Sequence, residues 1–395
     1  MDTPDSPFRH VLFLNWRDTR NPEGGGSEVY IERIAAELVR IGHRVTVLCA
    51  GHDGAPPEET TPDGTRILRR GGRHTVYARA ALTYLAGRLG VGRLGHRGLG
   101  RPDLVVDVCN GVPFFAPLYA GRPVLALVHH VHREQWPVVF GPWVARIGWW
   151  IESKLAVRVY RRCRYVTVSE ATKSELSGLG VAADRIAVVP NGTPDVVAGP
   201  APRTTHPSLL VLGRLVPHKR VEIALRTVAA LAADLPDVEL VVAGQGWWEP
   251  KLKDLAVEMN IQDRVRFAGF ITEEEKHAVL CSAWLALTPS IKEGWGLTIV
   301  EAGARATPTV AFRNAGGVAE AMVHDETGML ADDEEEFILQ VRNLLADDVR
   351  RKAMGEAARA HAAQFTWEAA GARFANLVAE IATAPGAADR QSIRR

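Results

Sequence analysis

The sequence is poor in cysteine and lacks the spacings by which cysteines bind zinc or build disulfide frameworks. Four cysteines occur among 395 residues, scattered and without a CxxC pair. Three of them lie in or beside apolar runs, which is typical of reduced core residues in a cytosolic protein. We therefore expect neither a disulfide framework nor a cysteine-based zinc site. The four are Cys49, Cys109, Cys163 and Cys281.

Long apolar runs and an excess of either charge are also lacking. No run of 18 apolar residues occurs, so no segment is expected to span a membrane. The first ten residues, MDTPDSPFRH, lack the pattern of a signal peptide. The formal net charge is only +1, which argues against a nucleic-acid partner. We expect a cytoplasmic protein that does not bind nucleic acid.

What the sequence does contain is two series of alternating strands and helices. They lie on either side of a proline-rich stretch at 194–207, which is the best linker candidate. The length fits two domains. We predict an α/β protein with an N-terminal domain of residues 1–195 and a C-terminal domain of residues 196–367.

The N-terminal half opens with a strand–helix–strand unit. A strand at 10–16 is followed by a glycine run at 24–26, and Ser27 is the predicted N-cap of the next helix. This arrangement suggests a nucleotide-binding type of fold, although the GxGxxG fingerprint is absent. Residues 51–64, rich in proline and acidic side chains, are predicted to form a loop.

Nine arginines and no acidic residue occur between residues 66 and 101. One interpretation is a solvated helical face with a loop. The other is a basic amphipathic patch that binds an anionic membrane surface or an anionic acceptor, which would make the protein peripheral on the inner face of the plasma membrane. A helix at 142–162, rich in tryptophan and basic residues, either packs in the core or forms a second membrane-facing surface.

Three histidines occur at the carboxyl end of the predicted strand at 123–130. Their spacing, in HHVHREQW, fits neither a zinc knuckle nor HExxH, and no cysteine is near. Ligands in open α/β sheets bind outside the carboxyl ends of the strands. We therefore expect a ligand contact, and no metal site, at His129, His130 and His132.

The stretch TPSIKEGWGLTIVEAG, residues 288–303, joins a buried strand to the helix-like run LTIVEAGARA through Gly294 and Gly296. The start of such a helix offers unpaired N–H groups to a phosphate. Glu293 and Glu301 are eight residues apart, about two helical turns, so they would contact two parts of one polyhydroxyl ligand. Taken alone, the two carboxylates would equally suit a solvated loop and a helix surface.

Arg214 and Lys219 provide the matching cations. They lie five residues apart, after the strand at 208–215 and before the next helix. An arginine fork and a lysine point charge are common partners of a diphosphate. Each would be an ordinary surface cation in isolation, but the nearby phosphate-binding stretch favours the diphosphate interpretation.

Together these motifs resemble family 4 of the retaining glycosyltransferases with the GT-B fold. The resemblance covers nearly the whole chain and rests on the glycine loop, GHRV at 42–45, PNG at 190–192, GRLVPHK at 213–219, AGQG at 243–246 and EGWGLTIVE at 293–301. It implies two Rossmann-like domains that face each other across a cleft. It also implies that a helix from about residue 368 to 395 packs back on the N-terminal domain.

The resemblance assigns roles to the matching residues. Arg214 and Lys219 would hold the diphosphate and stabilise it as it leaves, and Glu301 would bind the ribose hydroxyls. Glu293 would hold the donor sugar, which His129 would touch near the reacting carbon. The wider donor-binding set is Gly213, Gly244, Phe270, Ile271, Gly294, Trp295, Gly296, Leu297 and Thr298. The acceptor and phosphate loop set is Gly25, Gly26, Asn191 and His130, with His130 as the alternative to His129.

The resemblance also implies the chemistry. A hexose would move from a UDP- or GDP-sugar, with retention and without an essential metal or cofactor, to a lipid-linked, cell-wall or small-molecule acceptor. Two alternatives are a nucleotide-sugar epimerase or phosphorylase of the same fold and a non-catalytic protein that binds nucleotide sugars. Fold alone does not decide the base, the sugar or the acceptor.

Overall fold

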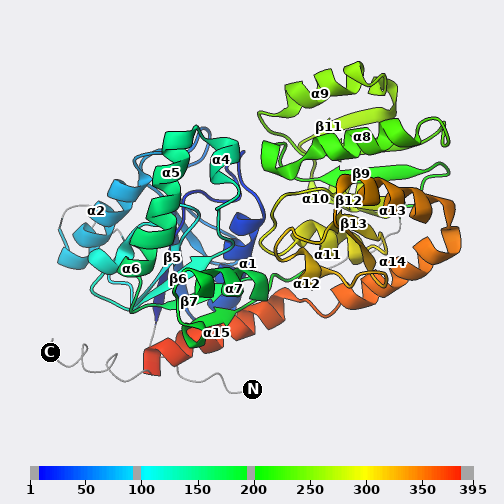
Figure 1. The fold of residues 1–395 in the computed structure, drawn as a ribbon. Helices are drawn as coiled ribbons and strands as arrows, with labels where there is room; N and C mark the ends of the chain where they lie inside the picture. Colours follow the sequence, from blue (N-terminus) through cyan, green and yellow to red (C-terminus); the bar gives the residue numbers. More distant parts are fainter. Residues whose placement is uncertain (1–8, 92–98, 194–200, 384–395) are drawn as a thin grey trace. The chain divides into compact units, whose positions relative to one another are not determined.

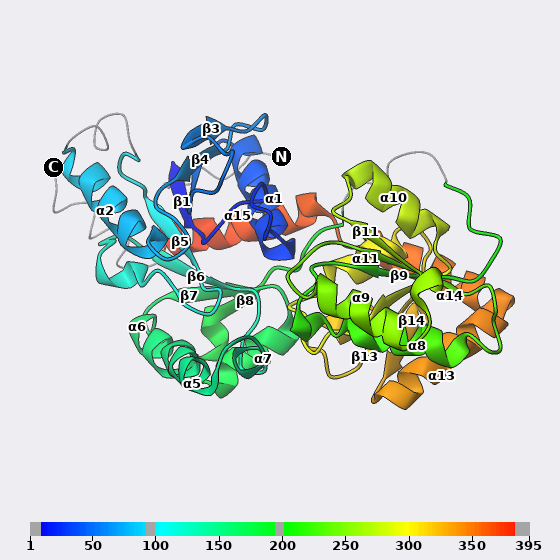
Figure 2. The same cartoon turned by 90° about the horizontal axis from the view of Figure 1, so that it is seen from above.

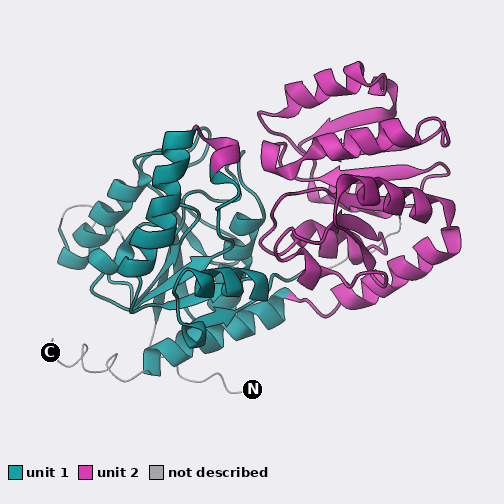
Figure 3. Cartoon of the chain, viewed as in Figure 1, with its two compact units in different colours: residues 1–136, 142–192, 367–395 teal, residues 137–141, 193–366 magenta. Residues whose placement is uncertain are grey.

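The computed structural model describes residues 9–91, 99–193 and 201–383, and it divides into two compact units. Unit 1 comprises residues 1–136, 142–192 and 367–395, and unit 2 comprises residues 137–141 and 193–366 (Figure 3). Half of the predicted linker (residues 194–200) and the last part of the helix expected at about 368–395 (residues 384–395) lie outside the described residues. Each unit is an α/β domain with its own sheet, as predicted.

Unit 1 is built on an eight-stranded sheet of order β3-β4-β2-β1-β5-β6-β7-β8. Only the β3–β4 pair is antiparallel, so the other carboxyl ends lie along one edge. The central strands are fully buried, as expected for a parallel sheet covered on both faces. The strands are β1 (His10–Leu14), β2 (Arg44–Cys49), β3 (Glu58–Thr60), β4 (Arg66–Arg69), β5 (Leu104–Val108), β6 (Val124–Val128), β7 (Arg164–Thr167) and β8 (Ile186–Val188).

Helices cover both faces of this sheet (Figures 1 and 2). The final helix belongs to unit 1: the ring of Phe374 stacks on Phe13 of β1 at 6.0 Å, and Gly371 lies against Glu37. The helices are α1 (Gly26–Arg40), α2 (Val76–Leu89), α5 (Pro142–Trp150), a π-helical segment (Ile151–Ala156), α6 (Val157–Val159), α7 (Glu170–Gly178) and α15 (Trp367–Thr383). A short helix, α4 (Trp136–Val139), begins in unit 1 and ends in unit 2.

Unit 2 has a six-stranded sheet of order β11-β10-β9-β12-β13-β14, in which every neighbouring pair is parallel. Its strands are β9 (Ser208–Leu212), β10 (Glu239–Ala243), β11 (Val265–Gly269), β12 (Leu285–Thr288), β13 (Thr309–Phe312) and β14 (Gly328–Ala331). Its helices are α8 (Val221–Leu231), α9 (Glu249–Glu258), α10 (Glu273–Ser282), α11 (Leu297–Gly303), α12 (Val318–Ala321), α13 (Glu334–Ala346) and α14 (Asp348–Ala362).

The structure corrects four details of the sequence interpretation. Residues 51–64 are not wholly a loop, because β3 pairs with β4. The stretch after β13 is not only helical, because β14 extends the sheet. Helix α1 begins at Gly26 with Gly25 as its N-cap, so Ser27 lies inside it. Helix α11 ends at Gly303, three residues before the end of the predicted helix.

Candidate active site

Glycines follow neighbouring strands at the carboxyl edge of the unit 2 sheet and bring their backbones into contact. Gly213 follows β9, Gly244 follows β10, and Gly269 ends β11. The N–H of Gly244 donates to the carbonyl oxygen of Gly269 at 2.7 Å. Gly244 has φ of 132°, and a Cβ there would lie 1.9 Å from the carbonyl oxygen of Gly213. Only glycine permits this close approach of the segments that follow β9 and β10 at the carboxyl edge of the sheet.

Lys219 and Glu293 form the charged centre of this edge, although they are 74 residues apart in sequence. The Nζ of Lys219 lies 2.6 Å from Oε1 of Glu293, and the same oxygen accepts a hydrogen bond from Ser290 Oγ at 2.7 Å. Gly213 and Arg214 line the same pocket as this pair. The structure therefore brings together the four residues that the sequence places at a diphosphate and donor sugar.

The pair is largely removed from solvent, with 22% and 15% of the two side chains exposed. Burial by itself raises the pKa of Glu293, but the charge and hydrogen bond of Lys219, with the hydroxyl of Ser290, hold the pKa below its ordinary value. Glu293 is thus an anion at neutral pH. Its backbone is fixed as well, because its N–H donates to Ala315 O at 3.0 Å and Gly317 N–H donates to its carbonyl at 3.0 Å.

Glu301 has a lysine partner of its own, which the sequence interpretation missed. Lys276 of α10 lies 2.9 Å from Oε1 of Glu301 on α11, and only 5% of the Glu301 side chain is exposed. Burial lowers the pKa of Lys276, but Glu301 and Glu273 outweigh it and the net shift is upward. Lys276 stands in the charged run EEEKH, which is typical of an exposed first turn of a helix, so no local signal marked it.

The other residues predicted to bind the donor differ in how far they are exposed to solvent. Gly296 adopts φ of 103° as the N-cap of α11, and Trp295 is 4% exposed with its ring 5.1 Å from that of Phe365. Trp295 thus packs against Phe365 within unit 2, and its role at the donor stays a prediction. Phe270, directly after β11, is 75% exposed. Gly294, Leu297, Thr298 and Ile271 are partly buried.

In unit 1, the structure distinguishes His129 from His130. His129 follows β6 directly, is 5% exposed, and its ring meets Tyr30 edge-on at 5.2 Å. Its Nε2 is buried and has no hydrogen-bond partner among the described residues. Burial lowers the pKa of His129 to about 4, so the ring is neutral at physiological pH. The His130 side chain instead forms a hydrogen bond with Gln135 at 3.2 Å, and its ring is tilted against that of His132 with 4.1 Å between the centroids.

Other predicted residues lie along the same edge of unit 1. Asn191 follows β8, is 6% exposed, and its Oδ1 has no partner in the described part of the chain. Tyr30, which the sequence interpretation did not select, links this edge together: it contacts His129 and donates its hydroxyl to Val189 O at 3.2 Å. The N–H of Gly25 donates to Glu28 at 2.8 Å, which closes the first turn of α1.

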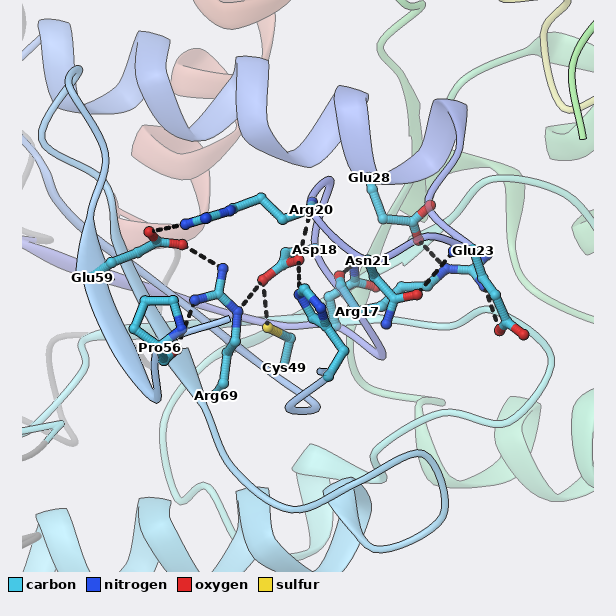
Figure 4. Close-up of polar contacts among 12 residues, drawn as sticks. Arg17, Asp18, Arg20, Asn21, Glu23, Glu28, Cys49, Pro56, Glu59 and Arg69 are labelled. Atoms are coloured by element: carbon cyan, nitrogen blue, oxygen red, sulfur yellow. Dashed lines mark hydrogen bonds and ion pairs between the residues drawn. The ribbon is translucent and has the colours of Figure 1, made fainter. Parts of the chain in front are cut away.

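A buried ionic network fixes the loop between β1 and α1 (Figure 4). Arg69 of β4 lies 2.6 Å from Asp18 and also pairs with Glu59, and its side chain is 1% exposed. Arg17 lies 3.3 Å from Glu28 of α1. This loop is anchored to β3, β4 and α1 at once, so its position at the carboxyl edge is set by ion pairs rather than by glycine flexibility alone.

The same contacts correct the interpretation of residues 66–101 as one basic patch. Residues 66–69 form a sheet strand, and four of the arginines pair with carboxylates from elsewhere in unit 1. Arg66 and Arg70 pair with Glu58, Arg69 pairs with Asp18 and Glu59, and Arg73 pairs with Glu23. Arg93 and Arg97 lie outside the described residues. The acid-free sequence window therefore does not form an acid-free surface.

Among the residues that the structure describes, no group of three histidine, cysteine, aspartate or glutamate side chains is arranged to hold a metal ion. No helix in the described ranges is long and apolar enough to cross a membrane. The two candidate sets also belong to different units: the lysine–carboxylate pairs to unit 2, and His129 and Asn191 to unit 1.

Comparisons with known proteins now define the class. Solved structures that match over most of their length include sucrose-phosphate synthase from Thermosynechococcus elongatus (TM-score 0.76, 20% identity, 93% of this chain and 98% of that chain) and HepE of Anabaena in complex with UDP-glucose (TM-score 0.70, 17% identity, 93% and 98%). With the two parallel-sheet domains, these likenesses show the fold of the GT-B glycosyltransferases.

The family follows from sequence. The family model described as glycosyltransferase family 4 matches residues 24–195, and that of glycosyl transferases group 1 matches residues 197–361. The chain belongs to the family 4 glycosyltransferases. It is 29% identical over 382 residues to a GDP-mannose-dependent α-(1-6)-phosphatidylinositol monomannoside mannosyltransferase of Mycolicibacterium smegmatis, covering 90% of this chain and 95% of that relative.

Proposed function

We propose that this glycosyltransferase moves a hexose from a nucleoside diphosphate sugar to a hydroxyl acceptor with retention of configuration. The observation that carries the proposal is the pocket in unit 2 where Arg214, Lys219 and Glu293 meet. Two cations would match the charge of a diphosphate, and a fixed carboxylate would accept hydrogen bonds from sugar hydroxyls. Glu301, held by Lys276, would accept hydrogen bonds from the ribose.

The chemistry needs no further group from the protein. The bond between the anomeric carbon and the diphosphate oxygen breaks, and a bond from that carbon to the acceptor oxygen forms on the same face. The acceptor proton passes to the departing phosphate oxygen. Negative charge grows on the diphosphate as it leaves, and Arg214 and Lys219 would stabilise that charge in the transition state. In this scheme the two cations take the place that a metal ion occupies in other transferases.

His129 is assigned a hydrogen-bonding role. Because its pKa is about 4, the imidazole is neutral at physiological pH and is not a cation for the diphosphate. A neutral ring donates from one nitrogen and accepts at the other, which suits a sugar hydroxyl. The unpartnered Nε2 supports this assignment.

For the donor, the likeness to a GDP-mannose-dependent relative over most of both chains supports a GDP-hexose first and a UDP-hexose second. The same relative is named for a phosphatidylinositol monomannoside acceptor. We therefore favour a lipid-linked acceptor over a cell-wall precursor or a small soluble molecule, and we place the enzyme at the inner face of the plasma membrane when it acts.

The test is thermal unfolding with a panel of GDP, UDP, GDP-mannose, GDP-glucose, UDP-glucose and UDP-N-acetylglucosamine. A ligand that binds only the folded state at 100 times its Kd stabilises it by about 2.7 kcal/mol, which shifts the midpoint of unit 2 by several degrees. We expect one base to be preferred and Glu301→Ala to abolish the shift. Absence of any shift across the panel would contradict the proposed donor class.

A further inference from the structure

The helix that runs from α5 into α6 lies on the surface of unit 1 (Figures 1 and 2). The first part of its outward face is apolar. Trp143, Ile147 and Trp150 are 74%, 57% and 55% exposed, and Val144 beside them is 53% exposed. Spacings of three and four residues put these side chains on one face of a helix. Large contiguous apolar patches on a protein surface mark interaction sites.

The orientation of this helix is fixed from its inner side. Ala145 and Gly148 are buried, and a Cβ at Gly148 would lie 2.4 Å from the ring of Trp136. Trp136 in turn donates its indole N–H to Glu152 at 2.7 Å, and Glu152 also binds His132 at 2.9 Å. Rotation to bury the outer tryptophans would break these contacts, so their exposure is a property of the fold.

The same outward stripe becomes cationic toward its carboxyl end. Lys154 and Arg158 continue the spacing of Trp150, and both are exposed. Arg146 is exposed as well and lies over the Trp143 ring at 5.3 Å. None of these three cations has a carboxylate partner among the described residues. The single acidic residue between 142 and 162 is Glu152, which is engaged on the inner side.

We infer that the outward face of residues 142–158 binds an anionic lipid surface. Tryptophan places an apolar ring with a polar N–H at the level of lipid head groups. Lysine and arginine bury their stems along apolar surface while their charges meet anionic lipids. Exposed tryptophans followed on the same face by lysine and arginine, with no carboxylate among them, suit contact with anionic lipid head groups.

This inference deepens the proposed function, because it presents unit 1 to a surface that holds a lipid-linked acceptor. It also moves the membrane contact away from residues 66–101, where ion pairs within unit 1 already occupy Arg66, Arg69, Arg70 and Arg73. Vesicle binding and nucleotide binding are measured separately, so the failure of one is distinguishable from the failure of the other.

The experiment is co-sedimentation of the full chain at low salt with vesicles of phosphatidylcholine alone or mixed with phosphatidylglycerol. We expect binding to the mixed vesicles. The triple variant Trp143→Ser, Ile147→Ser, Trp150→Ser should bind at least about tenfold more weakly. The pair Lys154→Glu, Arg158→Glu should lose about tenfold on mixed vesicles and little on phosphatidylcholine.

The matched control is Leu339→Ser with Val349→Ser, which removes exposed apolar side chains from unit 2 (52% and 81% exposed) and should bind like the wild type. Nucleotide-dependent thermal shifts should be unchanged in every variant, which shows that they fold. The inference is overturned if the wild type fails to bind mixed vesicles, or if the triple variant binds as tightly as the control. It is also overturned if the patch proves to hold two copies of the chain together, seen as a wild-type dimer that the triple variant abolishes while vesicle binding stays absent.

Discussion

The carboxyl edges of the two sheets are both lined by polar residues, but the edge of unit 2 carries ion-paired charged side chains and the edge of unit 1 carries neutral ones. In unit 2, each candidate carboxylate already has a lysine: Glu293 with Lys219 and Glu301 with Lys276. In unit 1, the corresponding edge holds a neutral histidine and an asparagine, and His129 Nε2 and Asn191 Oδ1 have no partners in the described part of the chain. The ion pairs of unit 1 instead anchor the loop between β1 and α1, as in the Asp18–Arg69 network.

The difference teaches how one fold supplies two kinds of binding surface. Paired charges keep buried carboxylates ionised before a ligand arrives, so unit 2 would exchange lysine contacts for phosphate and hydroxyl contacts with little reorganisation. Neutral unpartnered atoms suit a hydroxylated ligand, whose groups both donate and accept. Ion pairs in unit 1 would therefore act on stability, and those in unit 2 on catalysis.

The largest effect should follow from breaking the charged centre of unit 2. Lys219→Ala removes a cation from the proposed diphosphate site and leaves Glu293 without its ion pair, so we expect transfer turnover to fall about 100- to 1000-fold. The measurement is steady-state release of nucleoside diphosphate. Lys253→Ala is the control, because Lys253 forms an exposed pair with Glu249 on α9, and it should keep wild-type turnover. Equal turnover in both variants would contradict the assignment.

The matching change in unit 1 should alter stability. Arg69→Met removes the arginine that pairs with the buried carboxylate of Asp18, and removing one partner of a buried ion pair costs about 3–5 kcal/mol. Urea unfolding followed by circular dichroism measures the loss. Arg40→Met breaks a solvent-exposed pair with Glu37 and should leave the unfolding free energy close to that of the wild type. Similar losses in the two variants would mean that the Arg69 network does not anchor the loop.

The pH dependence of unit 1 sharpens the contrast. The pKa of His129 is 6.5 in the unfolded chain and about 4 in the folded protein. Between pH 6.5 and pH 4 the histidine is mostly protonated in the unfolded state but mostly neutral in the folded state. The free energy of unfolding therefore falls as the pH is lowered through this range. By pH 5 the loss is about 2 kcal/mol.

The corresponding measurement is the difference in unfolding free energy between the wild type and His129→Gln. The wild type should lose about 2 kcal/mol relative to the variant between pH 7.5 and pH 5. Asp107, whose pKa burial raises to about 6, is present in both proteins and cancels in the difference. A difference that does not change with pH would show that His129 is not buried as a neutral ring.

The smallest effect concerns Lys276. Lys276→Met should leave Glu301 in place but without its partner, so we expect nucleoside diphosphate to bind about tenfold more weakly. Lys276→Arg should restore most of the affinity, and discrimination against a 2′-deoxyribose nucleotide should fall only in the methionine variant. Isothermal titration of both nucleotides gives the ratio. Glu273→Gln removes the exposed partner of Lys276 and should change neither the affinity for nucleoside diphosphate nor the discrimination against the 2′-deoxyribose nucleotide. A methionine variant that discriminates like the wild type would exclude the role of Lys276 in positioning Glu301.

Periodicity and turn residues predicted most of the two sheets, because buried parallel strands are short apolar runs that end at glycine or proline. Strands β3, β4 and β14 were missed. They are three or four residues long, β3 and β4 carry charged residues, and the apolar run of β14 is too short to be told from a loop or a helix segment. The pattern around β4 instead indicated a basic surface.

The candidate residues that stand in short motifs were predictable, and Lys276 and Arg69, which stand in no motif, were not. Arg214, Lys219, Glu293 and Glu301 stand in motifs with fixed spacing, and the structure places the first three around one pocket. Lys276 meets Glu301 across 25 residues of sequence, and Arg69 meets Asp18 across 51. Pairings at that separation depend on strand order, which the sequence pattern alone does not specify.

The most direct test of the central claim is a proton NMR time course of the full chain with the nucleotide sugar that stabilises it, EDTA and a lipid extract of the producing organism. We predict that nucleoside diphosphate appears together with a new anomeric signal that has the configuration of the donor. A product of opposite configuration, a dependence on added metal, or conversion of the donor to an epimer without a new glycoside would contradict the account.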